Sequence, residues 1–171
     1  MKKTIAILLL LCLCLTAIGC SPEKDPIKSP VTFYYRRAEF YHGSEQSVIL
    51  GETRESEDIR GNIPRLLEEY LKGPVSEELA ATFPDDAKLI DYRTKDSSAF
   101  VTVSDELAQL SGIELTVACA CLAKTVIELT GIKSVHIQAQ TAMLGNEQVI
   151  IMDSSSILLL DSTQDNSERS E

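Results

Sequence analysis

The sequence contains no tryptophan, and aromatic residues of all kinds make up only 5% of its 171 residues. Because 44% of the residues are hydrophobic, a core of ordinary size is expected, built mainly from aliphatic side chains. Basic residues are scarce too, with 16 Lys and Arg against 26 Asp and Glu and a formal net charge of −10. An acidic surface repels phosphate groups, so this composition argues against nucleic acid as a partner and against a basic membrane-binding face.

Beyond the N-terminal segment, cysteine occurs only as Cys119 and Cys121. In a helix, residues two apart point to nearly opposite sides, so these two thiols can neither pair easily nor share a metal ion. Structural zinc usually needs four ligands, often arranged as Cys-x-x-Cys pairs, and the sequence beyond the N-terminal segment has no second cysteine pair. We therefore interpret both cysteines as small apolar core residues, in preference to a redox or metal site.

The usual signatures of hydrolases are missing. The two histidines, His42 and His136, form no His-x-x-x-His pair, and no serine lies in a Gly-x-Ser-x-Gly elbow. The run Ser154–Ser156 has no base placed to activate it. The glycines form neither a Gly-x-Gly-x-x-Gly nor a P-loop pattern for phosphate. We therefore predict that the protein is not an enzyme, and we assign no catalytic residue and no cofactor.

Two acidic stretches could attract a cation, Asp85-Asp86 and the run from Glu55 to Asp58. Neither has the alternating oxygen ligands and the later glutamate of a calcium-binding EF-hand loop. Solvated surface turns are the preferred interpretation, and we assign no metal ligand.

The first 19 residues have the pattern of a secretion signal. Lys2 and Lys3 precede an apolar run over 5–15, which leads to Gly19-Cys20. A bilayer span takes about 20 apolar residues, more than this stretch offers. A small residue before cysteine resembles the bacterial lipoprotein signal, so we predict lipidation at Cys20. Ala17 stands where leucine is usual, and a plain secretory signal is the alternative.

The remaining chain divides into three parts. Residues 20–30 contain three prolines and predict an extended tether after the lipidated cysteine. Residues 31–160 are expected to form one domain, and residues 161–171, which lack apolar side chains, a disordered acidic tail. This organisation predicts a lipid-anchored protein on the extracytoplasmic face of the cell membrane.

The centre of the domain is a predicted helix with a sharp stop. Its apolar residues recur every three to four positions: Leu66, Leu67, Tyr70 and Leu71. Asn62 suits the N-cap and Pro64 the first turn, while Gly73-Pro74 ends the helix. Two strands with alternating side chains follow, carrying Ile90, Tyr92 and Thr94 on the first and Ala99, Val101 and Val103 on the second, with a turn at 95–98.

Further strands are predicted over 31–35, 48–50 (closed by Gly51), 135–140, 148–152 and 157–160. A second helix follows Ser111, which has capping-box spacing to Glu114, and ends at Gly131. Its predicted core face comprises Leu115, Cys119, Leu122, Val126 and Leu129. The order β-β-α-β-β-α-β predicts an α+β fold, a mixed sheet with two main helices on one face and an extra C-terminal hairpin.

The order of these signals resembles the GerMN domain of sporulation and spore germination lipoproteins. The resembling segments are the strand 31–35, the helix and stop at 67–74, Phe83-Pro84 ahead of Leu89-Ile90, the strand and serine at 99–104, and the helix 122–130 with the strand 135–138. Together they span about 31–140. Asp86-Ala87 stands where the family tends to have Gly-Thr, and Ser97-Ser98 where its turn tends to carry glycine. The germination protein itself looks like two tandem copies of the domain, whereas this chain resembles one.

The resemblance implies a non-enzymatic, membrane-tethered module that contributes to protein assembly in the envelope, with a fold similar to ring-building motifs. Its expected partners are the membrane, through the lipid on Cys20, and an envelope or sporulation protein; an oligomer is compatible with this role. One alternative is a solute-binding or inhibitor-like envelope lipoprotein, with a pocket between the helices and the loop around His42. An unrecognised envelope hydrolase is the other.

Overall fold

The computed structural model describes residues 28–39, 47–57 and 61–160, so Cys20, His42 and the predicted tail at 161–171 lie outside the described residues. The strands are β1 (Lys28–Arg37), β2 (Ile49–Glu57), β3 (Leu79–Ala80), β4 (Leu89–Lys95), β5 (Ser98–Val103), β6 (Ser134–Ala139) and β7 (Ile150–Asp153). The helices are α2 (Ile63–Leu71), the 3-10 helix η1 (Asp105–Gln109), α3 (Gly112–Thr130) and α4 (Ser154–Leu160).

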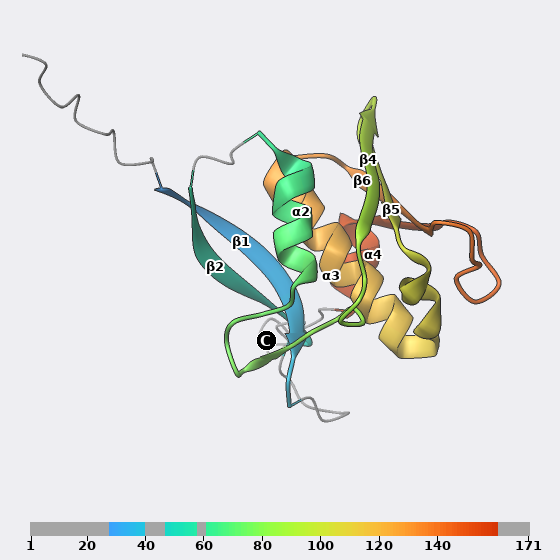
Figure 1. Ribbon diagram of the computed structural model, residues 1–171, viewed down its shortest axis with the longest axis horizontal. Coiled ribbons are helices and arrows are strands. Elements are labelled where there is room, and N and C mark those ends of the chain that lie inside the picture. Colours follow the sequence, from blue (N-terminus) through green and yellow to red (C-terminus); the bar gives the residue numbers. More distant parts are fainter. Residues whose placement is uncertain (1–27, 40–46, 58–60, 161–171) are drawn as a thin grey trace, which may run out of the picture.

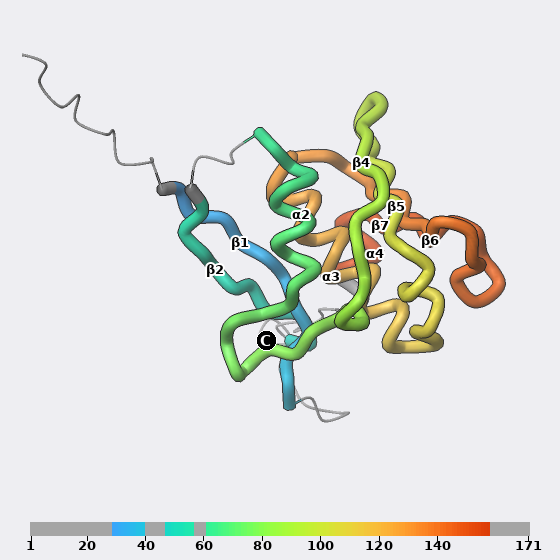
Figure 2. The backbone as a smooth tube through the Cα atoms, viewed as in Figure 1, coloured from blue at the N-terminus to red at the C-terminus, as the bar shows by residue number. Residues whose placement is uncertain are grey.

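The helices α2 and α3 lie between two sheets, as Figure 1 and the tube in Figure 2 show. The first, sheet A, has the strand order β2-β1-β3, and the second, sheet B, has the order β4-β5-β6-β7. All pairs are antiparallel except β5 and β6, which are parallel. Parallel neighbours need a crossover connection, and here η1 and α3 provide it. The predicted α+β class, with a mixed sheet and two main helices, is confirmed, and the strands divide between two sheets.

Helix α2 forms as the sequence predicts. The Oδ1 atom of Asn62 accepts a hydrogen bond from the backbone N–H of Arg65 at 3.3 Å, which satisfies a donor that the first turn leaves unpaired. Gly73 then adopts a φ of +89°, a conformation that glycine reaches without steric cost. The buried side chains are the four predicted ones, Leu66, Leu67, Tyr70 and Leu71.

Helix α3 is buried on more sides than its predicted stripe. Leu115, Cys119, Leu122 and Val126 are buried, but so is every residue from Val117 to Ala123. The reason is that sheet A packs on one side of the helix and sheet B on the other. The predicted capping box is wrong, because the Ser111 side chain makes no capping hydrogen bond although Ser111 occupies the N-cap position. Gly131 ends the helix with a φ of +71°.

Strand β2 is longer than predicted. It continues through Gly51, which was expected to close it, and through the charged residues up to Glu57. Gly51 lies opposite Tyr34 of β1, and a Cβ atom at this position would lie 2.9 Å from the Cγ2 atom of Thr32. The glycine therefore allows neighbouring side chains to pack over the strand rather than ending it.

The predicted C-terminal hairpin is wrong, because residues 154–160 form α4 instead of a strand. The Oδ1 atom of Asp153 accepts hydrogen bonds from the backbone N–H of Ser156 and from the hydroxyls of Ser155 and Ser156. These hydrogen bonds, led by that of the Ser155 hydroxyl, lower the pKa of Asp153 to about 2. Asp153 thus acts as the N-cap of α4. Residues 153–156, whose composition also suits a turn between two strands, therefore begin a helix.

The core is aliphatic for the most part, as expected, but part of it is aromatic. Four of the nine Phe and Tyr residues gather where β1 meets α2: Phe33, Tyr35, Tyr70 and Phe83. The Tyr35 and Tyr70 rings stack with centroids 4.9 Å apart, and Phe83 meets Tyr70 edge-on at 6.0 Å. A few aromatic side chains therefore fix the position of α2 on sheet A.

Truncation of a buried leucine on either helix should destabilise the domain strongly. Leu67 of α2 and Leu122 of α3 are buried, so Leu67→Ala and Leu122→Ala should each lower the free energy of unfolding by about 2–5 kcal/mol. Ile113→Ala is the control, because that side chain is 60% exposed and its loss should cost less than about 0.5 kcal/mol. Urea unfolding measures all three, and equal stabilities for the leucine variants and the control would show that the helix faces are misplaced.

Candidate functional site

The residue that the sequence singles out for modification, Cys20, lies outside the described residues, as does the loop around His42 that would line the alternative solute pocket. The structure therefore tests neither the lipidation nor that pocket. Both stay predictions.

Cys119 and Cys121 are fully buried in α3, and neither forms a disulfide within the described residues. Burial raises the pKa of Cys119 to about 12, so its thiol stays protonated at neutral pH. Within residues 28–39, 47–57 and 61–160, no three His, Cys, Asp or Glu side chains gather in a way that could hold a metal ion. The interpretation of the two cysteines as buried core residues is confirmed.

His136 lies on the solvent side of sheet B, as its alternation with Val135 and Ile137 predicts. Its ring stacks on Phe100 of β5, with the centroids 4.6 Å apart. The two neighbours of His136 along β6, Val135 and Ile137, lie on the opposite face of the sheet and are fully buried. The histidine is thus part of a surface rather than of an enclosed site.

A single line of side chains crosses all four strands of that surface. The register pairs Arg93 with Phe100, Phe100 with His136, and His136 with Ile151. The Arg93 guanidinium lies 5.3 Å from the centroid of the Phe100 ring, a cation–π distance. We call these four residues the cross-strand row.

Polar pairs flank the cross-strand row on both sides. The hydroxyls of Ser98 and Ser134 lie 2.9 Å apart, and the Gln138 side-chain amide donates to the Thr102 hydroxyl at 3.1 Å. These groups satisfy one another across β5 and β6, so the row is a mainly apolar and aromatic line between two polar ones. It ends at Ile151, which is 58% exposed. Exposed apolar side chains arranged in this way are typical of contact surfaces.

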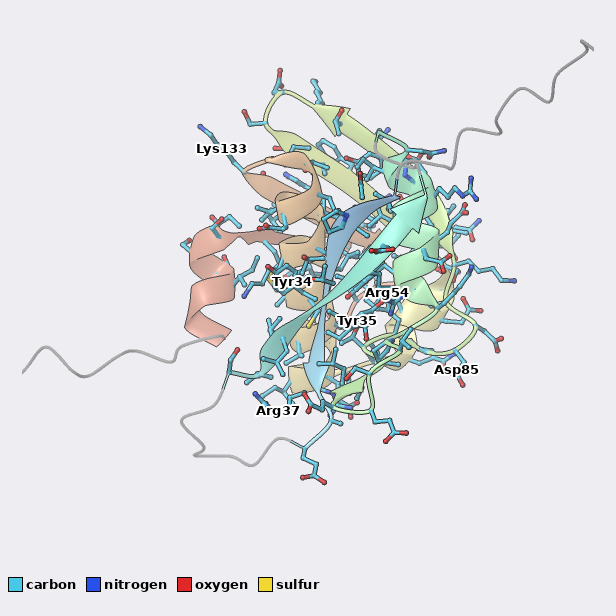
Figure 3. The ribbon with its side chains drawn as sticks, turned by 90° about the vertical axis from the view of Figure 1, so that its left-hand side faces the viewer. Tyr34, Tyr35, Arg37, Arg54, Asp85 and Lys133 are labelled. Atoms are coloured by element: carbon cyan, nitrogen blue, oxygen red, sulfur yellow. The ribbon has the colours of Figure 1, made fainter. Side chains whose placement is uncertain are left out.

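A second cluster of charged side chains lies on sheet A. The carboxylate of Glu52 accepts hydrogen bonds from the Arg54 guanidinium and from the backbone N–H groups of Val75 and Ser76. Arg54 also donates to the carbonyl of Gly73 at 2.8 Å and lies over the Tyr35 ring. Figure 3 shows Arg54 beside Tyr35 on the β1–β2 face. We call the pair Glu52 and Arg54 the charged latch, because it holds the turn after α2 onto sheet A.

Hydrogen bonds to the carboxylate of Glu52 determine the charge state of the latch. Burial by itself raises the pKa of Glu52, whose side chain is only 11% exposed. Hydrogen bonds from the Ser76 N–H, the Arg54 side chain and the Val75 N–H outweigh that effect, so the pKa lies below its ordinary value of 4.5. The latch is therefore charged at neutral pH.

The hollows of the described surface are open grooves. The groove between α2 and β4, of about 340 Å³, is lined by charges of both signs, with Glu68 and Asp85 against Lys72 and Lys88. Asp85 and Asp86 are exposed, as expected for a solvated turn. Among residues 61–160, no helix is long and apolar enough to span a bilayer, and the same holds for the shorter described segments.

Sequence reasoning missed the cross-strand row. Phe100 was available as a signal, because the alternation of Ala99, Val101 and Val103 already placed this large aromatic residue on the solvent side. Its alignment with Arg93 and Ile151 depends on strand register, which the sequence does not give. The structure also differs from the regular alternation predicted for Ile90, Tyr92 and Thr94. A β-bulge interrupts the register at the start of β4, and Ile90 is 45% exposed there.

Comparison with known proteins identifies the family. A family model named Germane, described as sporulation and spore germination, matches residues 32–141. The chain belongs to this family. The match covers β1 to β6 and includes most of the cross-strand row, and the family description names a process rather than a reaction. The chain thus carries a Germane domain associated with sporulation and spore germination. No curated protein matches it.

Solved structures support the same fold. The tandem GerMN domains of the sporulation protein GerM from Bacillus subtilis match with a TM-score of 0.60 and 19% identity, over 82% of this chain and 50% of the tandem structure. The first GerMN domain of the same protein matches with a TM-score of 0.53 and 17% identity, over 72% of this chain and 95% of that one. The chain therefore spans half of the tandem protein.

A third structure is a protein from Clostridium perfringens described as a candidate lipoprotein. It matches with a TM-score of 0.49 and 17% identity, over 81% of this chain and 97% of that one.

Neutralising the latch should destabilise the Germane domain. Glu52→Gln places an amide N–H₂ among hydrogen-bond donors, so we expect a loss of about 1–3 kcal/mol in the free energy of unfolding at pH 7. Because the folded-state pKa of Glu52 is lowered, this contribution is full above about pH 5 and disappears as the pH falls through the folded pKa. Urea unfolding between pH 7 and pH 3 measures it.

The matched control is Glu77→Gln, because Glu77 is exposed in the same loop region and makes no comparable contacts among the described residues. It should change stability by less than about 0.5 kcal/mol at every pH. A stability difference between Glu52→Gln and the unsubstituted protein that persists unchanged at pH 3 would contradict the assigned charge.

Proposed function

We propose that this protein is a lipid-anchored, extracytoplasmic binding module that takes part in protein assembly during sporulation or germination, and that it is not an enzyme. The family match over residues 32–141 supports the process, and the sequence pattern ending in Gly19-Cys20 supports the anchor. The domain contributes a surface rather than a reaction centre.

The observation that carries the binding role is the cross-strand row. Arg93, Phe100, His136 and Ile151 present cationic, aromatic and aliphatic groups side by side on one exposed sheet face. Aromatic and arginine side chains of this kind are enriched at protein–protein interfaces. A partner that covers the row would bury it together with the flanking hydroxyl and amide groups.

The anchor places this surface within reach of the membrane but facing away from the attachment. Strand β1 begins at Lys28, so only seven residues separate it from Cys20. At about 3.3 Å per residue these span at most about 23 Å. In Figure 1 the chain enters β1 on the left, whereas the strands of sheet B lie on the right. The row is therefore held close to the membrane and remains accessible.

The acidic balance of the chain suggests the chemistry of the partner. With a net charge of −10, the protein should associate faster with a basic surface than with an acidic one, and this steering weakens as salt rises. Anchoring raises the local concentration of a partner in the same membrane toward about 1 mM, so a modest interface of about 800 Å² per partner suffices.

Loss of the predicted lipid should release the protein. Cys20→Ala removes the thiol that is acylated, so we expect the chain to leave the membrane fraction or to stay unprocessed, with the domain still folded. Stable retention needs more than one acyl chain, so partial acylation should give partial release. Fractionation with mass spectrometry of the N-terminus measures this. A Cys20→Ala protein that stays membrane-bound and correctly processed would exclude the anchor.

The binding role is tested separately by crosslinking in intact membranes, with the full-length chain and a Phe100→Ala variant. We expect a crosslinked envelope or sporulation protein whose yield falls about tenfold in the variant, since buried aromatic anchors carry about 1–3 kcal/mol or more at interfaces. Tyr92→Ala on the opposite side of the neighbouring strand β4 is the control for general effects on sheet B. Purified protein that instead turns over an envelope substrate would contradict the non-enzymatic role.

A further inference from the structure

Strand β7 is an edge of sheet B, and its outer side is unpaired within the described part of the chain. The strand order places β6 on one side of it and no strand on the other. No backbone hydrogen bond among the described residues leaves β7 on the side away from β6. Such an edge offers a row of N–H and C=O groups that can accept another strand.

The other long edges carry features that discourage pairing. Strand β4 has a β-bulge at its start and the charged residues Asp91, Arg93 and Lys95 along its length. Strand β2, whose outer edge is also unpaired in the described part of the chain, carries three charged residues within four positions: Glu52, Arg54 and Glu55. Bulges and charged side chains are the usual means by which proteins protect sheet edges.

β7 has no bulge, and only its last residue is charged. Its residues Ile150, Ile151 and Met152 are uncharged, Val149 precedes them, and the first charge is Asp153 at its end. The β-branched residues favour an extended backbone. The cross-strand row also reaches this edge, because Ile151 is its last member and is 58% exposed. The edge and the exposed row therefore converge at Ile151.

We propose that β7 pairs with the β7 strand of a second copy of this chain, antiparallel about a two-fold axis at Ile151. In this register Ile151 lies opposite Ile151 of the second copy, and Ile150 lies opposite Met152. Asp153 lies opposite Val149, so no charge of either copy faces a like charge along the pair. The two cross-strand rows join at the axis, and sheet B continues through both copies.

This pairing is weak in dilute solution. Strand β7 has only four residues, and each copy carries a net charge of −10, so the strand pair buries little area against a general repulsion. Two copies anchored in one membrane meet at an effective concentration of about 1 mM, which favours the pair. Only this last step rests on the proposed lipid anchor, while the strand pairing itself does not.

Disulfide trapping with the full-length chain in its own membrane tests the register directly. Opposite residues of an antiparallel pair have Cα atoms about 4.5–5.5 Å apart, a separation that suits a disulfide. Ile151→Cys should therefore give a disulfide-linked dimer under mild oxidation, in about tenfold higher yield than Ile113→Cys. Ile113 is a matched control because it is 60% exposed and lies on α3, and the buried Cys119 and Cys121 should not compete.

A second variant tests the same contact without a crosslink. Ile151→Lys places two cations opposite each other at the axis, so the full-length protein, concentrated in detergent toward about 1 mM to populate the weak pair, should shift toward monomer in sedimentation, whereas Ile113→Lys should not. Higher salt should strengthen the pair of the unsubstituted protein, because it screens repulsion between two acidic copies. This direction is opposite to the one expected for a basic partner.

Equal dimer yields from Ile151→Cys and Ile113→Cys would overturn the inference. So would an adduct that joins the introduced thiol at 151 to a different protein instead of a second copy, since another occupant would then cover the edge. A dimer in a protein whose Cys20→Ala variant stays membrane-bound and correctly processed would leave the strand pairing intact while excluding the anchor. Membrane-bound protein that forms no dimer would instead exclude the strand pairing and leave the anchor intact.

Discussion

The burial of α3 between two sheets is the constraint on which the rest of the domain depends. The middle of α3 is apolar on most sides and cannot face water, so sheet A, sheet B and α4 all pack on it. Its centre is rich in alanine and cysteine, whose small side chains let strands approach from both sides. Without either sheet, a continuous run of buried residues from Val117 to Ala123 would be exposed.

In the same arrangement, only a short part of β1 has a strand partner on the side of β3, and α3 supplies a hydrogen-bond acceptor there. On one side β1 pairs with β2 over its length, but on the other it pairs with β3 only at Arg36 and Arg37. The backbone N–H of Tyr34 instead donates to the hydroxyl of Thr125 at 2.9 Å, and Thr125 is fully buried. An unpaired buried N–H would cost about 1–3 kcal/mol, so one threonine in an apolar helix couples α3 to sheet A.

The charged latch extends this coupling to the surface. Helix α2 is fixed on sheet A by the stack of Tyr35 and Tyr70, and Glu52 and Arg54 hold the turn that follows it. Because the helices lie between the two sheets, the solvent sides of the sheets point away from each other. The cross-strand row on sheet B is therefore presented by a rigid body, which lowers the entropy lost when a partner binds.

Elements with strong local signals could be predicted, and those that depend on register or on neighbours could not. The spacing of Leu66 and Leu67 defined α2, and the alternation at Val101 and Ile137 defined β5 and β6. Gly51 gave a false end to β2, because the packing of Tyr34 over it is a tertiary contact. Asp153 suits a turn and a helix cap equally well from sequence. The cross-strand row follows only from the pairing of four strands, so it could not be predicted from the segments taken one at a time.

Native-state hydrogen exchange tests most directly whether α3 joins the two sheets into one cooperative body. The amides of α3 from Ala118 to Val126, of Tyr34 in β1 and of Val101 in β5 should exchange only through global unfolding, with one common free energy. Their exchange should also show the same denaturant dependence. If the amides of sheet A exchange through a separate opening of lower free energy while α3 and sheet B stay protected, the two sheets are independent and the account is wrong.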